Sequence, residues 1–404
     1  PGVLADAGAA DADMLIAVTQ VDEINMVACN VAHTLFNVPT KIARIRQQAY
    51  LEGRWQDLFR SQHVPIDVII SPEVEVARAI ALRLEVPGAV NCVTFAEDRV
   101  RLVAVRAAPD CPVNDTPLRQ LTYLFPDLHL MVVAIGRGER IFIPDADDQI
   151  LAGDEVHFVV ETANIARALK AFGYEERLSD RLVIGGGGNV GLFLALEIER
   201  RHPELAVKLI EGAPARAELV ADRLNRTVVL HGDVRDRDVL DEANVGSASA
   251  MVTVTNSDEI NIVVGLLAKR LGCRRSLALV NNSTYNLLNL SIGLDVAINP
   301  RDITVSSILQ HVRRGRIKAV HAIGDGEAEV YEAEALETSQ LVGRPLREAR
   351  FAGGLIVGAV VRKGEVIMPR GDTLIRGGDR VILAARKDMV KRVEQLFAVR
   401  LDYF

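Results

Sequence analysis

The 404-residue sequence is poor in cysteine, has no excess of positive charge and contains no long apolar run. Its four cysteines form no CxxC pair and follow no zinc or disulfide spacing, which indicates core or surface thiols in a reducing compartment. The net charge of -7 argues against nucleic acid as a partner, because the release of phosphate counterions requires a basic protein face. The longest stretch without a charged residue, 276–294, is rich in asparagine and serine and cannot cross a bilayer as a helix. Any role at a membrane is therefore expected to be peripheral.

The composition that is present, 49% hydrophobic and 25% charged, is typical of a globular protein with roughly two to four domains. An internal repeat organises these domains. The stretch "AVTQVDEINMVACNVA" (17–32) aligns without gaps with "TVTNSDEINIVVGLLA" (253–268), and two later segments align at similar offsets. By this offset of 236, Pro1 corresponds to Arg237. We therefore expect an N-terminally truncated first copy, whose first strand, glycine loop and acidic strand end lie outside this sequence.

The first part of each repeat alternates strands with helices, which favours a doubly wound parallel sheet. In the second copy the expected strands are 181–185, 206–211, 227–232, 250–255 and 276–280, and the expected helices are 189–201, 215–224, 236–243 and 258–271. The fold class predicted for the chain is thus α/β, with tandem Rossmann-like sheets that are each followed by a small α+β domain.

The second part of each repeat has a different order of elements. It predicts a leading helix, a strand, a short helix, a hairpin around "GRGE" or "RKGE", a final strand after Gly-Asp, and a closing helix at 163–172 or 387–396. The predicted domains are a sheet domain at 1–62, an α+β domain at 63–173, a second sheet domain at 179–294 and a second α+β domain at 295–404.

The segment "VIGGGGNVG" carries the G-x-G-x-x-G pattern of a nucleotide-binding loop in Gly186, Gly188 and Gly191. The first glycine permits a tight turn, the second lets backbone approach a pyrophosphate, and the third lets helix and strand pack closely. Glu211 ends the next strand, where a carboxylate can accept both ribose hydroxyls and would repel a 2'-phosphate. This favours NAD over NADP but does not separate NAD from ATP or ADP. The alternative is a glycine turn without a ligand.

Other polar residues follow strands at the edge where a doubly wound sheet binds ligands. The candidates for ligand contact are Asp233, Thr255 and Asn256 in the second copy, and Thr19, Gln20 and Arg44 in the first. Helix capping or turn formation is the alternative for most of them, and a surface ion pair is the alternative for Arg44. The pairs Asp22-Glu23 and Asp258-Glu259 lie in a first helical turn, where compensation of the helix dipole is a sufficient reason for them.

Catalytic groups are not evident in the sequence. His202 and His231 have no carboxylate that the sequence places beside them, and no nucleophile arrangement or metal-ligand cluster stands out. We therefore predict neither a catalytic residue nor a metal site.

These features together give the chain a resemblance to the TrkA family, the cytosolic regulators of bacterial Trk potassium uptake. Its members consist of two tandem RCK units, each an RCK_N (KTN) domain followed by an RCK_C domain. The resemblance is carried by "VIGGGGNVG", "LAKRLG", "NPRDITVSSILQHVRRG" and "GDRVILAARKDMVKRVEQLF", and by the doubled domain order. It implies NAD(H) or ATP/ADP as regulatory ligands, with contacts from Gly186, Gly187, Gly188, Asn189, Val190, Gly191, Glu211, Asp233, Thr255 and Asn256, and in the first site from Thr19, Gln20 and Arg44. It implies no enzymatic activity.

The resemblance also implies partners and a location. A homo-oligomer in the form of a tetrameric ring would act on a membrane-embedded Trk channel subunit of the TrkH or TrkG type, from the cytoplasmic face of the inner membrane. The sequence departs from the pattern at one point, since the second copy reads "ALVNN" where the first has "ARIR", and so lacks an arginine matching Arg44. Two other functions stay open: an NAD-dependent oxidoreductase, and a nucleotide sensor for another cation transporter.

Overall fold

The computed structural model describes most of the chain as two compact units, Pro1–Ala77 and Arg78–Phe404. The described residues are 1–50, 57–59, 63–86, 88–124, 129–138, 140–174, 181–282, 285, 293–312, 317–324, 326–349 and 353–397. Among the helices described, none is long and apolar enough to span a membrane. All four cysteines are buried and unpaired, so they belong to the core rather than to the surface.

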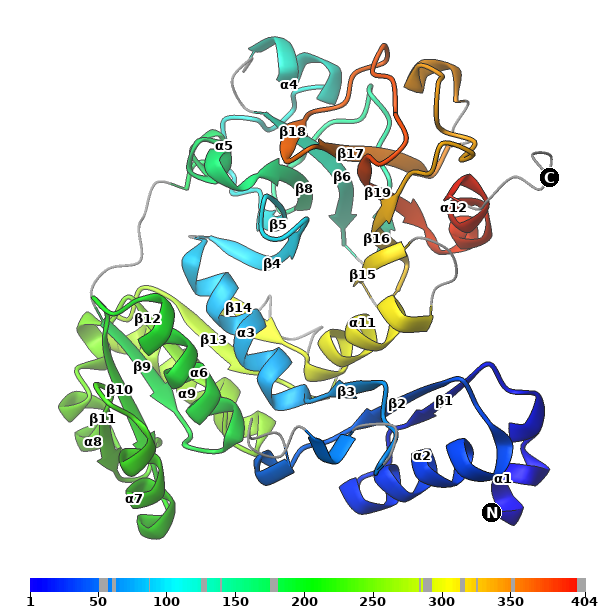
Figure 1. The fold of residues 1–404 in the computed structure, drawn as a ribbon. Helices are drawn as coiled ribbons and strands as arrows, with labels where there is room; N and C mark the ends of the chain where they lie inside the picture. Colours follow the sequence, from blue (N-terminus) through cyan, green and yellow to red (C-terminus); the bar gives the residue numbers. More distant parts are fainter. Residues whose placement is uncertain are drawn as a thin grey trace. The chain divides into compact units, whose positions relative to one another are not determined.

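The smaller unit contains a parallel sheet of three strands in the order β1-β2-β3 (Figure 1). Its strands are β1 (Met14–Ala17), β2 (Thr40–Arg44) and β3 (Val68–Ile70), and its helices include α1 (Gly2–Asp6) and α2 (Asp22–Phe36). The buried face of α2 packs Met26 and Cys29 against Ala43 and Ile45. Helix α3 (Pro72–Glu85) begins in this unit and continues into the larger one.

The larger unit contains a six-stranded parallel sheet in the order β11-β10-β9-β12-β13-β14. The strands are β9 (Arg181–Gly185), β10 (Ala206–Glu211), β11 (Val228–His231), β12 (Ala250–Thr253), β13 (Ser276–Leu279) and β14 (Val296–Ile298). The helices between them are α6 (Asn189–Arg201), α7 (Pro214–Arg223), α8 (Arg237–Glu242) and α9 (Asp258–Leu271). This order confirms the predicted Rossmann-like sheet, and it reverses direction between β9 and β12, where such sheets bind ligands.

Local sequence explains why these elements form where they do. Strand β12 is fully buried and apolar except for Thr253, as expected for a strand covered on both faces. Helix α6 buries Leu192, Ala195 and Ile198 at helical spacing. Helix α9 ends at Gly272, whose φ of +109° gives the left-handed cap that glycine favours.

Two antiparallel sheets with the same topology complete the larger unit, in the orders β4-β5-β8-β6-β7 and β15-β16-β19-β17-β18 (Figure 1). The first comprises β4 (Ala89–Phe95), β5 (Val100–Arg106), β6 (Leu130–Arg137), β7 (Arg140–Phe142) and β8 (Glu155–Glu161), with α4 (Leu118–Leu124) and α5 (Ile165–Ala171). The second comprises β15 (Ile317–Ile323), β16 (Ala328–Glu334), β17 (Leu355–Arg362), β18 (Glu365–Ile367) and β19 (Arg380–Arg386), with α11 (Pro300–Val312) and α12 (Val390–Phe397).

The two antiparallel sheets share a hydrophobic core. Leu102 and Val133 of the first sheet pack in one cluster with Val330 and Ile382 of the second. The sheets approach so closely that a Cβ on Gly358 would lie 2.9 Å from a methyl group of Val159. Burial of these apolar faces joins the two α+β domains of the chain.

One detail of the predicted α+β domain was wrong. The sequence predicts a single strand between the leading helix and the short element that follows it, whereas the structure has antiparallel pairs, β4 with β5 and β15 with β16. The turn between β4 and β5 contains Ala96, Glu97 and Asp98 with positive φ, although it lacks glycine, the residue that adopts this conformation most readily. The predicted domain boundaries stay predictions, and the strands that follow two of them, β3 and β14, pair with the parallel sheets.

Candidate functional site

The glycine loop between β9 and α6 is the centre of the candidate site. Gly186 has a φ of +112°, which glycine alone adopts readily. A Cβ on Gly191 would lie 1.9 Å from the backbone oxygen of Gly186, so glycine is required for the helix to pack on the loop. A Cβ on Gly188 would meet no atom within 4 Å. The loop is therefore open at Gly188, where a ligand can approach the backbone.

The N-terminus of α6 has no side-chain cap. Gly188 occupies the N-cap position, and within the described residues no side chain accepts a hydrogen bond there. By contrast, the Ser257 hydroxyl accepts the N–H of Ile260 at the start of α9. The first N–H groups of a helix lack intrahelical partners and form the positive end of its dipole. Residues Asn189 and Val190 thus present donors that suit a phosphate.

Glu211 lies against the same loop. One oxygen of its carboxylate accepts the N–H of Gly187 at 2.7 Å, and the other accepts the N–H of Ala213 at 2.8 Å. A carboxylate has about four acceptor sites, so these bonds leave capacity for ribose hydroxyls. The structure therefore brings Glu211 to the glycine loop, in the position that the sequence predicts.

Thr255 also lies beside the loop, since a Cβ on Gly186 would be 3.0 Å from the Thr255 nitrogen. The backbone N–H and the hydroxyl of Thr255 both donate to Oδ1 of Asn261, at 2.8 and 2.7 Å. The Thr255 hydroxyl is thus engaged in turn formation, the alternative that the sequence left open. Asn256 follows it and is exposed.

Asp233 lies two residues beyond β11, whose last residue pairs with Glu211. Arg235 donates to both oxygens of the Asp233 carboxylate, at 2.9 and 2.5 Å. These hydrogen bonds lower the pKa of Asp233 to about 2, so its carboxylate is charged at neutral pH. Contact between a ligand and Asp233 remains a prediction.

The three candidates in the smaller unit occupy the corresponding strand ends. Thr19 donates to Asn25 at 2.8 and 2.7 Å through its backbone N–H and its hydroxyl, and Gln20 is exposed. Arg44 ends β2, and in the described part of the chain its Nε is buried without a hydrogen-bond partner. The predicted alternative of a surface ion pair therefore finds no support among the residues described. A phosphate would satisfy this buried donor.

Sequence reasoning missed one residue at the glycine loop, Arg216. It lies in the first turn of α7 and donates from Nε to the backbone oxygen of Gly187 at 2.7 Å. It also donates from Nη2 to Oδ1 of Asn189 at 3.2 Å. Its place five residues after Glu211 was the available signal, because that spacing puts it at the start of the helix that follows the acidic strand end.

The prediction that His202 lacks a nearby carboxylate was wrong. Its Nδ1 lies 3.3 Å from Glu204, and its Nε2 lies 3.3 Å from Glu85, which is far away in the sequence. Arg201 and Arg101 contact the same Glu85 carboxylate. This cluster of ion pairs lies between elements of the larger unit and has the composition of a structural network. No described group of three or more His, Cys, Asp or Glu side chains is arranged to hold a metal ion.

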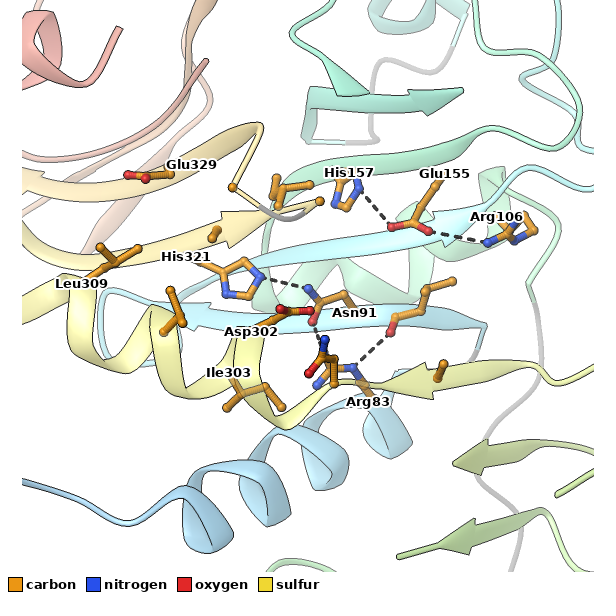
Figure 2. A pocket seen from close by; sticks show the side chains of 18 of the residues that line it. Arg83, Asn91, Arg106, Glu155, His157, Asp302, Ile303, Leu309, His321 and Glu329 are labelled. Carbon is orange, nitrogen blue, oxygen red and sulfur yellow. Dashed lines mark hydrogen bonds and ion pairs between the residues drawn. The ribbon is translucent and has the colours of Figure 1, made fainter. Parts of the chain in front are cut away.

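A polar cavity of about 480 Å³ lies elsewhere in the larger unit, between the antiparallel sheets and α11 (Figure 2). His321 on β15 points toward Asn91 on β4, with Nε2 and Nδ2 at 2.9 Å. His157 on β8 points toward Glu155 at 3.1 Å. Burial, with the nearby charges of Arg83 and His157, lowers the pKa of His321 to about 3. The cavity therefore holds neutral His321 at physiological pH, and none of the predicted site residues lines it.

Two known domain families match the parallel and antiparallel parts of the chain. The TrkA-N domain matches residues 1–72 and 182–300, and the TrkA-C domain matches residues 102–173 and 330–398. The chain belongs to the TrkA family. The Trk system potassium uptake protein TrkA of Azorhizobium caulinodans is 52% identical over 404 residues, which are 100% of this chain and 88% of that protein. The predicted family is thereby confirmed.

Solved structures support the same architecture for this TrkA family member. The match to the GsuK RCK domain covers 99% of this chain and 83% of the GsuK chain, with a TM-score of 0.55 and 18% sequence identity. The match to the GsuK channel bound to NAD covers 99% of this chain and 69% of the GsuK chain, with a TM-score of 0.57 and 18% sequence identity. At this identity the likeness shows the fold alone.

Proposed function

We propose that the chain is a nucleotide-binding regulatory subunit of a Trk-type potassium uptake system and has no enzymatic activity. The observation that carries the proposal is the glycine loop, which is open at Gly188, leads into the uncapped helix α6 and has the Glu211 carboxylate against it. The relative from Azorhizobium caulinodans, a potassium uptake protein by name, supports the transport role. The GsuK channel bound to NAD supports an adenine nucleotide as the ligand class.

The regulatory mechanism follows from linkage between binding and conformation. NAD(H), ATP or ADP in the loop would shift the protein between two states only to the extent that it binds one of them more tightly. Two nucleotides that favour opposite states would therefore act as opposed signals. The proposed contacts of the second nucleotide site are the residues that the sequence predicts around its glycine loop. The proposed contacts of the first site are Thr19, Gln20 and Arg44, at the ends of β1 and β2.

We also propose a homo-oligomer, in the form of a tetrameric ring, that acts on a membrane-embedded subunit of the TrkH or TrkG type from the cytoplasmic face. Both sheet domains expose a valine at equivalent positions of the repeat. Val27 of α2 is 61% exposed, and Val263 of α9 is 58% exposed. Ile24 and Leu35 extend the exposed apolar face of α2, at 53% and 57%. A second copy that covers these faces would remove apolar surface from water.

The test uses Gly191→Ala in the full chain. A Cβ at this position collides with the Gly186 oxygen, so the loop must distort, and we expect nucleotide binding to fall at least tenfold. Calorimetric titration with ATP, ADP, NAD and NADH measures the binding. Potassium uptake in cells that lack the native gene and carry the variant measures the function, and we expect uptake to lose its response to nucleotide levels.

Gly353→Ala is the matched control, because this exposed glycine has open space around its Cβ position. Normal uptake in the deletion strain without the gene would contradict the transport role. Substrate-dependent oxidation of NADH by the purified chain would contradict the absence of enzymatic activity.

A further inference from the structure

The second glycine loop lacks a positive side chain at the strand end where the first copy carries one. Nδ2 of Asn25 donates to the backbone oxygen of Arg44 at 2.9 Å, and Nδ2 of Asn261 donates to that of Leu279 at 2.9 Å. These matching bonds show that Leu279 in the second copy is equivalent to Arg44 in the first. The second copy therefore has a leucine where the first has an arginine, and the dipole of α6 alone offers only about half a unit of positive charge.

Arg216 brings a guanidinium to this loop from a different element. Its Nε donates to the oxygen of Gly187, while the nitrogen of the same glycine donates to Glu211. Its Nη2 reaches the side chain of Asn189, the first residue of α6. The charge of Arg216 thus lies between the glycine loop and the helix N-terminus, the two features that face a nucleotide phosphate.

The guanidinium has donors left for a ligand. It carries five N–H groups, and the contacts with Gly187 and Asn189 use two of them in the described part of the chain. The side chain is also anchored at the base of the loop, so little conformational entropy would be lost when the remaining donors bind a phosphate. Arginine is the residue that best combines such anchoring with recognition of phosphate oxygens.

We infer that Arg216 is the phosphate-recognising residue of the second nucleotide site, where it takes the role proposed for the strand-end Arg44 in the first. The inference rests on the proposed nucleotide-binding function and adds a specificity to it. The site would select adenosine nucleotides by their phosphates through Arg216, and by their ribose through Glu211. Adenosine itself would bind without help from Arg216.

The experiment compares adenosine, AMP and ADP as ligands of the full chain by calorimetric titration. In Arg216→Ala we expect the affinity for ADP to fall about tenfold and the affinity for adenosine to change less than about twofold. Arg216→Gln keeps a donor for Gly187 but not the charge, and we expect the same selective loss. Arg216→Lys keeps the charge and should recover part of the ADP affinity.

Arg223→Ala is the matched control, because Arg223 lies in the last turn of the same helix and is exposed. An equal loss of ADP and adenosine affinity in Arg216→Gln would overturn the inference, since it would mean that Arg216 only shapes the loop. Unchanged ADP affinity in Arg216→Ala would overturn it as well. If the unmodified chain binds none of the three ligands, the proposed function itself fails, and the inference fails with it.

Discussion

The ends of β1 and β12 carry the same hydrogen-bond network in the two copies of the sheet domain. Thr19 with Asn25 and Thr255 with Asn261 form the same pair of bonds, at 2.8 and 2.7 Å in both copies. Each amide also donates to the backbone oxygen of the last residue of the next strand, and that residue is Arg44 in one copy and Leu279 in the other. The comparison teaches that the side chains which hold the backbone are duplicated, while the side chain at the strand end differs between the copies.

The two antiparallel sheets show the same division. Arg137 with Asp154 and Arg362 with Asp379 form matching ion pairs with two hydrogen bonds each. The positions around the polar cavity differ, since His157 of β8 corresponds to Ile382 of β19 by sheet register. The histidine that β8 contributes to the cavity is therefore not part of the repeated pattern.

The largest effect is expected when the matching ion pairs are broken. Asp379→Ala should lower the free energy of unfolding by about 4 kcal/mol, because it leaves a guanidinium without its buried partner. Asp154→Ala should cost only about half as much, because Arg137 is 41% exposed and can be hydrated, whereas Arg362 is 22% exposed. Urea denaturation followed by circular dichroism measures both.

Asp388→Ala serves as the control for these variants, since its ion pair with Arg386 is exposed and should leave the free energy of unfolding nearly unchanged. Equal losses for Asp154→Ala and Asp379→Ala would show that the exposure of the arginine does not matter.

A smaller effect is expected from the amides that join strand ends to helices. Asn261→Leu should lower the free energy of unfolding by about 3 kcal/mol, because it leaves backbone groups of Thr255 and Leu279 without partners. Asn25→Leu should cost less, since Thr19 is exposed and water can replace the amide there. The same denaturation measurement applies, with Arg270→Ala at an exposed position of α9 as control. A larger loss for Asn25→Leu would contradict the comparison.

The smallest of these effects concerns pH and His321, which lines the cavity. The pKa of His321 is lowered to about 3 in the folded protein, against an ordinary value of 6.5. The unfolded chain therefore binds a proton that the folded chain does not, and stability is lost as the pH falls from about 6.5 toward 3. Near pH 5 this loss amounts to about 2 kcal/mol.

We expect His321→Gln, which keeps an acceptor for Asn91, to flatten the stability of the protein between pH 7 and 5, as measured by thermal unfolding. The exposed histidine of β11, changed in His231→Gln, is the control. A pH dependence that is unchanged in His321→Gln would show that other groups cause it.

Much of the parallel sheet domain could be predicted from the sequence. The predicted helices 189–201 and 258–271 have the bounds of α6 and α9, because glycine, serine and acidic residues mark their ends within a few residues. Glu211 could be placed at the glycine loop for the same reason, since strand, loop and helix follow one another directly. The antiparallel hairpin of β4 and β5 could not, because its pairing depends on register across a turn that contains no glycine or proline.

By itself, the sequence determined the duplication, the Rossmann-like order and the glycine loop with its acidic partner. These features depend on spacing along the chain, where local sterics and hydrogen bonds decide the outcome. Only the tertiary structure decided that Arg216 reaches Gly187 and that His321 meets Asn91 across 230 residues. Such contacts depend on how helices and sheets pack, and packing brings together side chains whose separation in the sequence carries no signal.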